Sequence, residues 1–129
     1  MIYVADAHSL VWFLTKNNNL GKEALKVFRD ADQGNVFVVI PSIVIAEIIY
    51  IAENKGRGTE FDDLLKKMDE SINYLVYNLN LEVLRNMQKY TKIKEMHDRI
   101  IVTTAKIIKA KLISKDEEII KSGIVETVW

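Results

Sequence analysis

The sequence predicts an α/β fold in which a mainly parallel sheet of about five strands carries helices on both faces. Short apolar runs rich in β-branched residues recur along the chain, and amphipathic segments of helical length separate them. Apolar runs without polar alternation are typical of strands that are covered on both faces. Strands that alternate with helices are typical of a parallel sheet.

Length and composition predict a single domain over residues 1–129, because no repeat, low-complexity tract or linker divides the chain. The 18 basic and 18 acidic residues cancel, so a strong overall positive field for binding nucleic acid is not indicated. The absence of cysteine excludes disulfides and thiolate metal sites. We find no signal peptide and no apolar run of membrane-spanning length, and therefore expect a cytoplasmic protein.

The first half of the chain contains two predicted strands, at residues 2–5 and 36–40. An apolar helix is expected at 9–14, and apolar residues at helical spacing predict a second helix between Gly21 and Gly34. Pro41 and Ser42 end the second strand, and Ser42 suits the start of the next helix, expected at 43–54. Thr59 is a candidate N-cap for a helix at 59–70.

The second half contains predicted strands at 74–77, 111–114 and 125–129. Asn80 is expected to cap a helix that continues to residue 90. A basic loop at 91–97 leads to a strongly apolar helix at 98–110, and a small helix is expected at 117–122.

Four acidic residues occupy informative positions in these elements: Asp6, Glu47, Asp98 and Asp116. Asp6 and Asp116 follow strands, and Asp98 begins a helix. Taken singly, each aspartate is explained by a capping role or by a favourable interaction with the helix dipole.

Glu47 differs, because nearly all of the side chains around it in its helix are apolar. Such a helix is expected to be buried on most sides. An ionised carboxylate there is costly unless it is paired, neutralised or bound to a metal. The alternative is a glutamate at the edge of the buried region, where the helix reaches solvent.

The predicted topology brings these carboxylates close together, because the carboxyl ends of parallel strands meet at one edge of a sheet. Asp6 and Asp116 lie at that edge, and the helices that carry Glu47 and Asp98 cross the same sheet. Clustered carboxylates repel one another unless a cation lies between them, and hard oxygen ligands favour Mg²⁺ or Mn²⁺. Such an ion suits phosphoryl chemistry, because it polarises a phosphate oxygen and helps to generate hydroxide.

At this point four segments resemble the motifs of PIN-domain proteins, and in particular the VapC-type toxins of bacterial and archaeal toxin–antitoxin pairs. Each motif alone is weak, but their order along a chain of this length is more specific, and they cover essentially the whole chain. The segments are Val4-Ala5-Asp6-Ala7-His8 with the apolar stretch 10–14, residues 41–48, residues 97–105 and Leu112-Ile113-Ser114-Lys115-Asp116.

The resemblance implies a three-layer α/β/α fold and a metal-dependent ribonuclease site whose acidic residues would be Asp6, Glu47, Asp98 and Asp116. It also implies that Ser114 is the hydroxyl residue that orients water or metal, although a strand-end hydroxyl bonded to backbone is an alternative. Ala7 departs from the pattern, because many relatives carry Thr or Ser there. We expect this change to lower activity at most.

The sequence thus predicts a Mg²⁺- or Mn²⁺-dependent endoribonuclease in which the three aspartates bind the ion and Glu47 is a ligand or a base acting through water. By resemblance, its partners would be RNA, an antitoxin that covers the acidic site, and a second copy in a homodimer. A non-catalytic PIN-like module that binds RNA or protein is the alternative. A phospho-acceptor domain is a weaker one, because Asn78 and Asn80 follow the third strand where it needs aspartate.

Several other side chains have both a local and a functional interpretation. His8 and His97 flank acidic positions and suit substrate contact, proton transfer or an ordinary surface position. Trp12 and Phe13 are expected in the core or in an apolar dimer surface. Basic residues that could hold RNA phosphates, or be solvated surface charges, are Lys55, Arg57, Lys92, Lys94 and Arg99.

Overall fold

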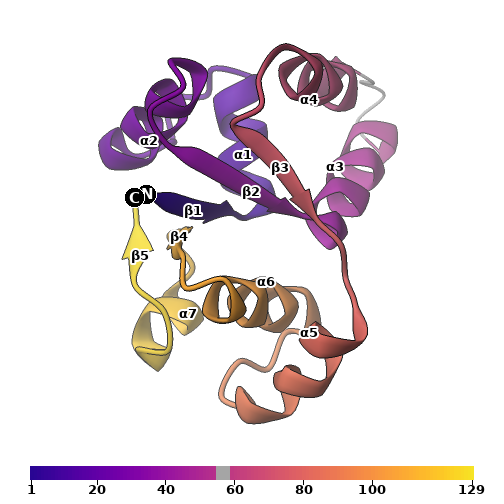
Figure 1. Ribbon diagram of the computed structural model, residues 1–129, viewed down its shortest axis with the longest axis vertical. Helices are drawn as coiled ribbons and strands as arrows, with labels where there is room; N and C mark the ends of the chain where they lie inside the picture. The colour runs from indigo at the N-terminus through magenta and orange to yellow at the C-terminus, as the bar shows by residue number, and fades with distance from the viewer. Residues whose placement is uncertain (55–58) are drawn as a thin grey trace.

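The computed structural model describes residues 1–54 and 59–129, and its strands form one five-stranded sheet (Figure 1). All four strand pairs are parallel, and the order across the sheet is β3-β2-β1-β4-β5. This confirms the predicted α/β class. The strands are β1 (Ile2–Ala5), β2 (Phe37–Pro41), β3 (Tyr74–Tyr77), β4 (Lys111–Ile113) and β5 (Thr127–Val128).

Helices cover both faces of the sheet and complete the three layers. In Figure 1, α1, α2 and α4 lie on one face, and α5, α6 and α7 lie on the other. Helix α3 contacts α1 and α4 and also reaches α6. The helices are α1 (Ala7–Leu14), α2 (Lys22–Asp32), α3 (Ser42–Asn54), α4 (Thr59–Glu70), α5 (Leu81–Asn86), α6 (Met96–Ile107) and α7 (Glu117–Ser122), with a 3₁₀ turn η1 (Met87–Lys89) after α5.

The handedness of the connections explains this division of the helices. From β1 the chain steps to β2 and then to β3, and the connecting helices of these steps occupy one face. It then returns to the other side of β1 to form β4 and β5, which reverses the direction of travel. Because crossovers between parallel strands are right-handed, the reversal moves the later helices to the opposite face.

The central strands explain the continuous apolar runs in the sequence. The side chains of Val4, Val38, Ile40, Leu112 and Ile113 are fully buried. Val4 is in register with Val39 on one side and with Leu112 on the other. A strand with neighbours on both sides and helices on both faces has no solvent-exposed side, so every position favours an apolar residue.

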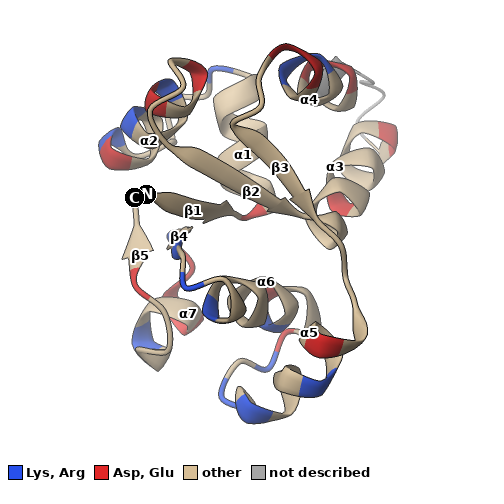
Figure 2. Cartoon of the chain, viewed as in Figure 1, with Lys and Arg blue, Asp and Glu red and all other residues tan. Residues whose placement is uncertain are grey.

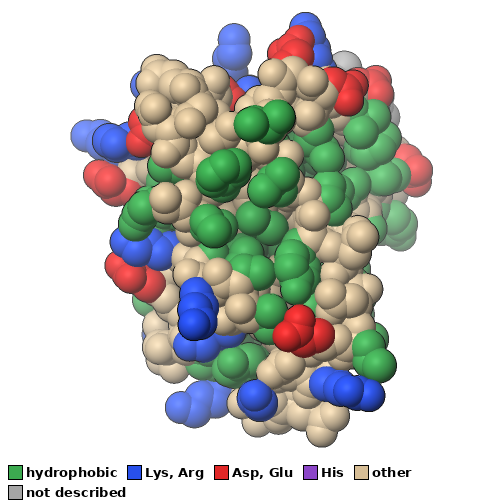
Figure 3. Space-filling view, in the orientation of Figure 1, with side chains coloured by type: hydrophobic (Ala, Val, Ile, Leu, Met, Phe, Trp, Pro, Cys, Tyr) green, Lys and Arg blue, Asp and Glu red, His purple; other side chains and the backbone are tan. Residues whose placement is uncertain are grey.

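One part of the sheet stays uncovered on the face to which α6 packs. Ile2 and Phe37 are register partners on this face, and they are 43% and 39% exposed. Leu75 in the edge strand β3 is 44% exposed and pairs with Val39. Figure 3 shows hydrophobic side chains gathered over the strands in this view.

Several predicted boundaries were wrong. Helix α1 begins at Ala7, because Asp6 caps it. Helix α6 begins at Met96 and not at residue 98, and it ends at Ile107, shortly before Lys109 takes a left-handed conformation with a φ of 56°. The helix expected to continue to residue 90 is divided into α5 and η1, although Asn80 caps α5 as predicted.

The start of α3 also differs in detail from the expectation. Pro41 is the last residue of β2, and Ser42 is the first residue of α3. The Ser42 hydroxyl accepts a hydrogen bond from the backbone N–H of Leu79 (3.0 Å), which joins α3 to the segment after β3. The proposed capping role of Thr59 and the loop at 55–58 lie outside the residues whose side chains the structure describes.

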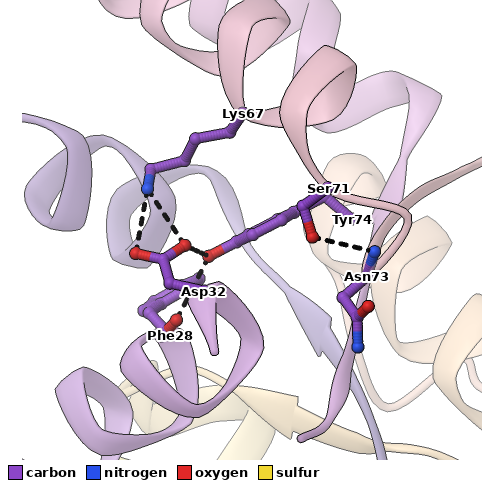
Figure 4. A network of polar contacts seen from close by, with 6 residues as sticks. All are labelled: Phe28, Asp32, Lys67, Ser71, Asn73 and Tyr74. Carbon is purple, nitrogen blue, oxygen red and sulfur yellow. Dashed lines mark hydrogen bonds and ion pairs between the residues drawn. The ribbon is translucent and has the colours of Figure 1, made fainter. Parts of the chain in front are cut away.

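A polar network joins α2, α4 and β3 at the far side of the sheet from α6 (Figure 4). The Tyr74 hydroxyl donates to Asp32 Oδ1 (2.7 Å) and lies 3.2 Å from the carbonyl oxygen of Phe28. Lys67 Nζ lies 3.0 Å from both carboxylate oxygens of Asp32. Burial and the bond to Asp32 raise the pKa of Tyr74, so its phenol remains a hydrogen-bond donor.

We predict that Tyr74→Phe lowers the free energy of unfolding by about 1–2 kcal/mol, because the buried carbonyl oxygen of Phe28 and the partly exposed carboxylate of Asp32 lose this hydrogen-bond donor. The matched control is Tyr77→Phe in the same strand, since the Tyr77 hydroxyl makes no hydrogen bond within the described residues. Urea unfolding of the two variants measures the difference. Equal midpoints would show that the network does not stabilise the fold.

Candidate functional site

The candidate site lies at the edge of the sheet where β1 and β4 end side by side. Ala5 is in register with Ile113, and the backbone N–H of Asp6 lies 3.4 Å from the Ile113 carbonyl oxygen. From this edge, α1 leaves towards one face and α7 towards the other (Figure 1). Open α/β sheets bind ligands where successive connections diverge in this way. Figure 2 shows acidic positions at the end of β1 and in α3.

Asp6 and Asp116 both cap helices, as their positions after strands suggested. Asp6 Oδ1 accepts the backbone N–H of Ser9 (2.9 Å), and Asp116 Oδ1 accepts that of Ile119 (3.0 Å). In the described part of the chain, the second carboxylate oxygen of each makes no hydrogen bond. Each cap therefore fixes a carboxylate and leaves one of its oxygens for a ligand, so the capping and metal-binding interpretations are compatible.

Asp98 does not cap its helix, because Glu95 does. Glu95 Oε2 accepts the backbone N–H of Asp98 (2.7 Å), which places Asp98 in the first turn of α6. Among the described residues, the Asp98 carboxylate accepts no hydrogen bond. Sequence reasoning missed Glu95, since it lay in a segment interpreted as a basic loop. The spacing of an acidic residue three positions before Asp98 was the available signal, although glutamate is not a favoured N-cap.

The predicted carboxylates lie close enough to Asp98 to affect its pKa. Burial raises the pKa of Asp98 to about 7, and repulsion by other carboxylates adds to this effect. The acidic residues responsible are, in decreasing order, Asp116, Glu95, Asp6 and Glu47. The segments that follow β1 and β4, together with α3 and α6, thus bring all four residues selected from the sequence into one cluster with Glu95.

Glu47 is half-buried in α3, and its Oε1 atom is buried without a hydrogen-bond partner among the described residues. Burial raises the pKa of Glu47, and the charges of Glu95 and Asp6 raise it further, whereas His97 and His8 act in the opposite direction. An unpartnered buried carboxylate oxygen is costly. A cation or a proton at this atom would remove that cost.

The histidines lie beside the cluster and partly compensate its charge. His97 Nδ1 lies 2.7 Å from Glu95 Oε1, and this hydrogen bond raises the pKa of His97. Burial alone would raise the pKa of Glu95, but hydrogen bonds from the Asp98 backbone and from His97 hold it below its usual value. His8 is exposed and lies edge-on to Trp12, with ring centroids 6.0 Å apart.

Ser114 is fully buried, and its hydroxyl bonds to the backbone of the turn that follows β4. Its hydroxyl oxygen accepts the backbone N–H of Asp116 (3.1 Å), which corresponds to the strand-end alternative in the sequence interpretation. This bond fixes the turn that leads from β4 to α7. Ser114 therefore orients Asp116 through the backbone.

The donor set fits a hard divalent cation, because it consists of carboxylate oxygens, some of which lack partners. Within residues 1–54 and 59–129, no three acidic or histidine side chains converge closely enough to form a closed metal site. The geometry is therefore a cluster of mutually repelling carboxylates and not a preformed coordination shell.

The basic residues considered from the sequence have different environments. Arg99 Nε donates to the carbonyl oxygen of Ile93 (2.7 Å), so this guanidinium partly serves the local fold. The side chains of Lys92 and Lys94 are exposed. Lys55 and Arg57 lie outside the described residues.

A hollow of about 870 Å³ lies away from the carboxylates, between α1, α2 and α4. Trp12 and Phe13 line it, and both also pack within the chain, because Phe13 stacks on Phe28 with ring centroids 4.6 Å apart and Trp12 lies beside Trp129. None of the five clustered carboxylates lines this hollow.

Residues 3–123 match the PIN domain family, and the chain is a member of that family. This confirms the family indicated by the sequence motifs. The comparison with curated protein sequences found no match. No helix within residues 1–54 and 59–129 combines the length and the apolar content needed to cross a bilayer.

Solved structures with the same fold include proteins of toxin–antitoxin pairs. VapBC2 from Rickettsia felis, bound to a DNA fragment from its promoter, matches with a TM-score of 0.72 at 15% identity, over 99% of this chain and 98% of that one. VapC20 from Mycobacterium tuberculosis, a Sarcin-Ricin loop cleaving toxin, matches with a TM-score of 0.72 at 11% identity, over 98% of each chain. FitAcB from Neisseria gonorrhoeae matches with a TM-score of 0.65 at 17% identity, over 100% and 97%. At these identities the likeness establishes the fold.

The raised pKa of Asp98 predicts how stability depends on pH in the absence of metal. Between the ordinary aspartate pKa of 3.8 and about 7, the folded chain binds a proton that the unfolded chain releases. Raising the pH through this window therefore lowers the free energy of unfolding. We predict that Asp98→Asn reduces this decline and is more stable than the wild type at pH values above the window.

Thermal unfolding in EDTA at several pH values measures this effect. Asp69→Asn, an exposed residue of α4, is the matched control and should leave the pH dependence unchanged. If Asp98→Asn declined as steeply as the wild type, Asp98 would not be the group that carries this proton.

Proposed function

We propose that this PIN domain is a Mg²⁺- or Mn²⁺-dependent endoribonuclease and the VapC-type toxin of a toxin–antitoxin pair, formed by one domain over residues 1–129. The observation that carries the proposal is the gathering of acidic side chains around Asp98, with its pKa near 7 and the unpartnered oxygen of Glu47. Family membership and the fold shared with toxin–antitoxin proteins support it.

In this proposal Asp6, Asp98 and Asp116 hold one or two ions, and Glu47 is either a further ligand or a base that acts through water. Asp6 and Asp116 would use the oxygens that their caps leave free. A bound Mg²⁺ or Mn²⁺ polarises a phosphate oxygen and lowers the pKa of a bound water. The raised pKa of Glu47 makes its carboxylate a stronger base than an ordinary glutamate, which suits it to accept a proton from that water.

Two residues would support the site without contacting RNA. Glu95 fixes the start of α6 and thereby orients Asp98, and Ser114 fixes the turn that carries Asp116. Both act through backbone N–H groups of the acidic residues, so we propose positioning roles for them.

The proposed partners are RNA, a second copy of the chain in a homodimer, and an antitoxin that covers the acidic edge in a cytoplasmic complex. A toxin–antitoxin complex from Klebsiella pneumoniae shares the fold, with a TM-score of 0.69 at 17% identity over 98% of this chain and 96% of that one. An antitoxin segment with basic side chains would neutralise the clustered carboxylates.

We predict that Asp98→Asn and Asp116→Asn each lower RNA cleavage by at least about 100-fold, since loss of an ion ligand removes several kcal/mol of transition-state stabilisation. Asparagine at position 116 keeps an oxygen that can cap α7, so the fold should persist. Cleavage is measured with Mg²⁺, with Mn²⁺ and with EDTA.

Asp69→Asn serves as the control variant and should cleave like the wild type. Circular dichroism checks that each variant remains folded. Cleavage by Asp98→Asn that is unchanged and insensitive to EDTA would contradict the metal mechanism.

One observation favours a second candidate, a non-catalytic PIN-like module that binds RNA or protein. The side chains that the structure describes include no three at the spacing of a closed metal site. Calorimetric titration with Mn²⁺ separates the candidates. The nuclease should bind Mn²⁺ and lose this binding in Asp98→Asn, whereas a non-catalytic module should give the same weak signal in both.

A further inference from the structure

Lys115 lies in the turn between β4 and α7 and is held against two aromatic rings. Its Nζ atom is 4.6 Å from the centroid of the Trp12 ring and 5.6 Å from that of Trp129. The two indoles meet edge-on, with centroids 5.8 Å apart. These contacts restrict the flexible side chain of the residue that precedes Asp116 in sequence.

The ammonium of Lys115 remains available to a ligand. It makes no ion pair or hydrogen bond with any described residue, although two glutamates follow Asp116 in sequence. The first of them, Glu117, is 3.9 Å from Lys121 instead. An ammonium has three N–H donors, and a contact with the face of an indole satisfies its charge but not those donors.

Trp12 contacts two side chains whose residues are close in sequence to acidic residues of the cluster. On one side it supports Lys115, next to Asp116, and on the other its ring lies 6.0 Å from that of His8, two residues after Asp6. Helical spacing explains the second contact, because His8 and Trp12 are four positions apart in α1.

A site formed by clustered carboxylates repels the phosphates of an RNA chain. The chain as a whole carries no net positive charge to overcome this repulsion. A fixed cation at the margin of the cluster would attract one phosphate and leave the adjacent phosphodiester at the acidic residues. Lys115 has the position and the free donors for this role.

We propose that the ammonium of Lys115 binds a phosphate of single-stranded RNA next to the acidic cluster, and that Trp12 is a positioning residue that holds the ammonium there. This inference rests on the proposed ribonuclease function. Trp129 supplies the second aromatic surface. Its backbone and ring pack directly against Gly21, where there is no room for a side chain. A Cβ atom at Gly21 would lie 2.4 Å from the carbonyl carbon of Trp129.

The competing explanation is that the contact only attaches the end of the chain to α1. A purely structural contact would change stability but not the salt dependence of RNA binding. Each lysine that neutralises a phosphate of single-stranded nucleic acid contributes about 0.7 to the slope of log affinity against log salt concentration. The slope therefore separates the two explanations.

The test measures binding of a short, labelled single-stranded RNA by fluorescence anisotropy at several KCl concentrations, in the full chain with Asp98→Asn to prevent cleavage. Lys115→Gln should lower affinity at low salt about ten-fold and reduce the slope by about 0.7. Lys115→Arg should retain the slope. Lys106→Gln is the matched control, because Lys106 is exposed in the last turn of α6, far from Asp98 in the first turn.

Trp12→Leu should lower affinity while Lys115 still contributes to the slope, and Trp12→Phe, which keeps an aromatic face, should restore most of the loss. In the chain with Asp98 intact, Lys115→Gln should raise KM for RNA cleavage several-fold with little change in kcat. These results would support both parts of the inference.

Unchanged affinity and slope in Lys115→Gln, or no RNA binding by the parent chain, would overturn the inference. Equal affinities of Trp12→Leu and the parent would overturn the positioning role of Trp12. The proposed nuclease function fails separately, if the wild type binds RNA with dependence on Lys115 but does not cleave it.

Discussion

β1 hydrogen-bonds to β2 on one side and to β4 on the other, and the candidate site depends on this double pairing. It places the end of β1 beside Ile113, so that Asp6 and Asp116 leave adjacent strands towards opposite faces. Helix α3 begins where β2 ends, and α6 contacts both β1 and β4, so Glu47 and Asp98 reach the same edge. The apolar centre of the sheet provides the stability that permits like charges to remain close together there.

The acidic residues differ in what they contribute to the fold: two of them cap helices, and two make no cap. Asp6 and Asp116 stabilise helix starts through one oxygen each, whereas Asp98 and Glu47 are held in half-buried positions that favour their protonated forms. The network of Asp32, Lys67 and Tyr74 joins α2, α4 and β3 and shares no residue with this cluster (Figure 4). Loss of a site carboxylate therefore need not unfold the domain, and in metal-free conditions the neutralisation of Asp98 should strengthen it.

Local patterns were sufficient to predict the strands and most helices, because the carboxyl-terminal parts of β1 and β2 are buried on both faces and the amphipathic helices repeat at 3.6 residues. They also selected Asp6, Glu47, Asp98 and Asp116, since parallel topology brings strand ends together. They missed the start of α6, because a glutamate that folds back onto its own helix has no strong local signature. The backbone role of Ser114 and the contact of Lys115 with Trp12 and Trp129 depend on tertiary packing between distant segments, which periodicity does not encode.

The packing of Trp12 against Trp129 has a spectroscopic consequence, because these two indoles are the only tryptophans in the sequence. All indole emission of the folded chain therefore originates at one place, with the Lys115 ammonium directly against the emitting rings. Tryptophan fluorescence of the unlabelled protein consequently reports on a single site, the contact of both indoles with Lys115. This chain thus contains an intrinsic fluorescent probe of the Lys115 contact, without any engineered fluorophore.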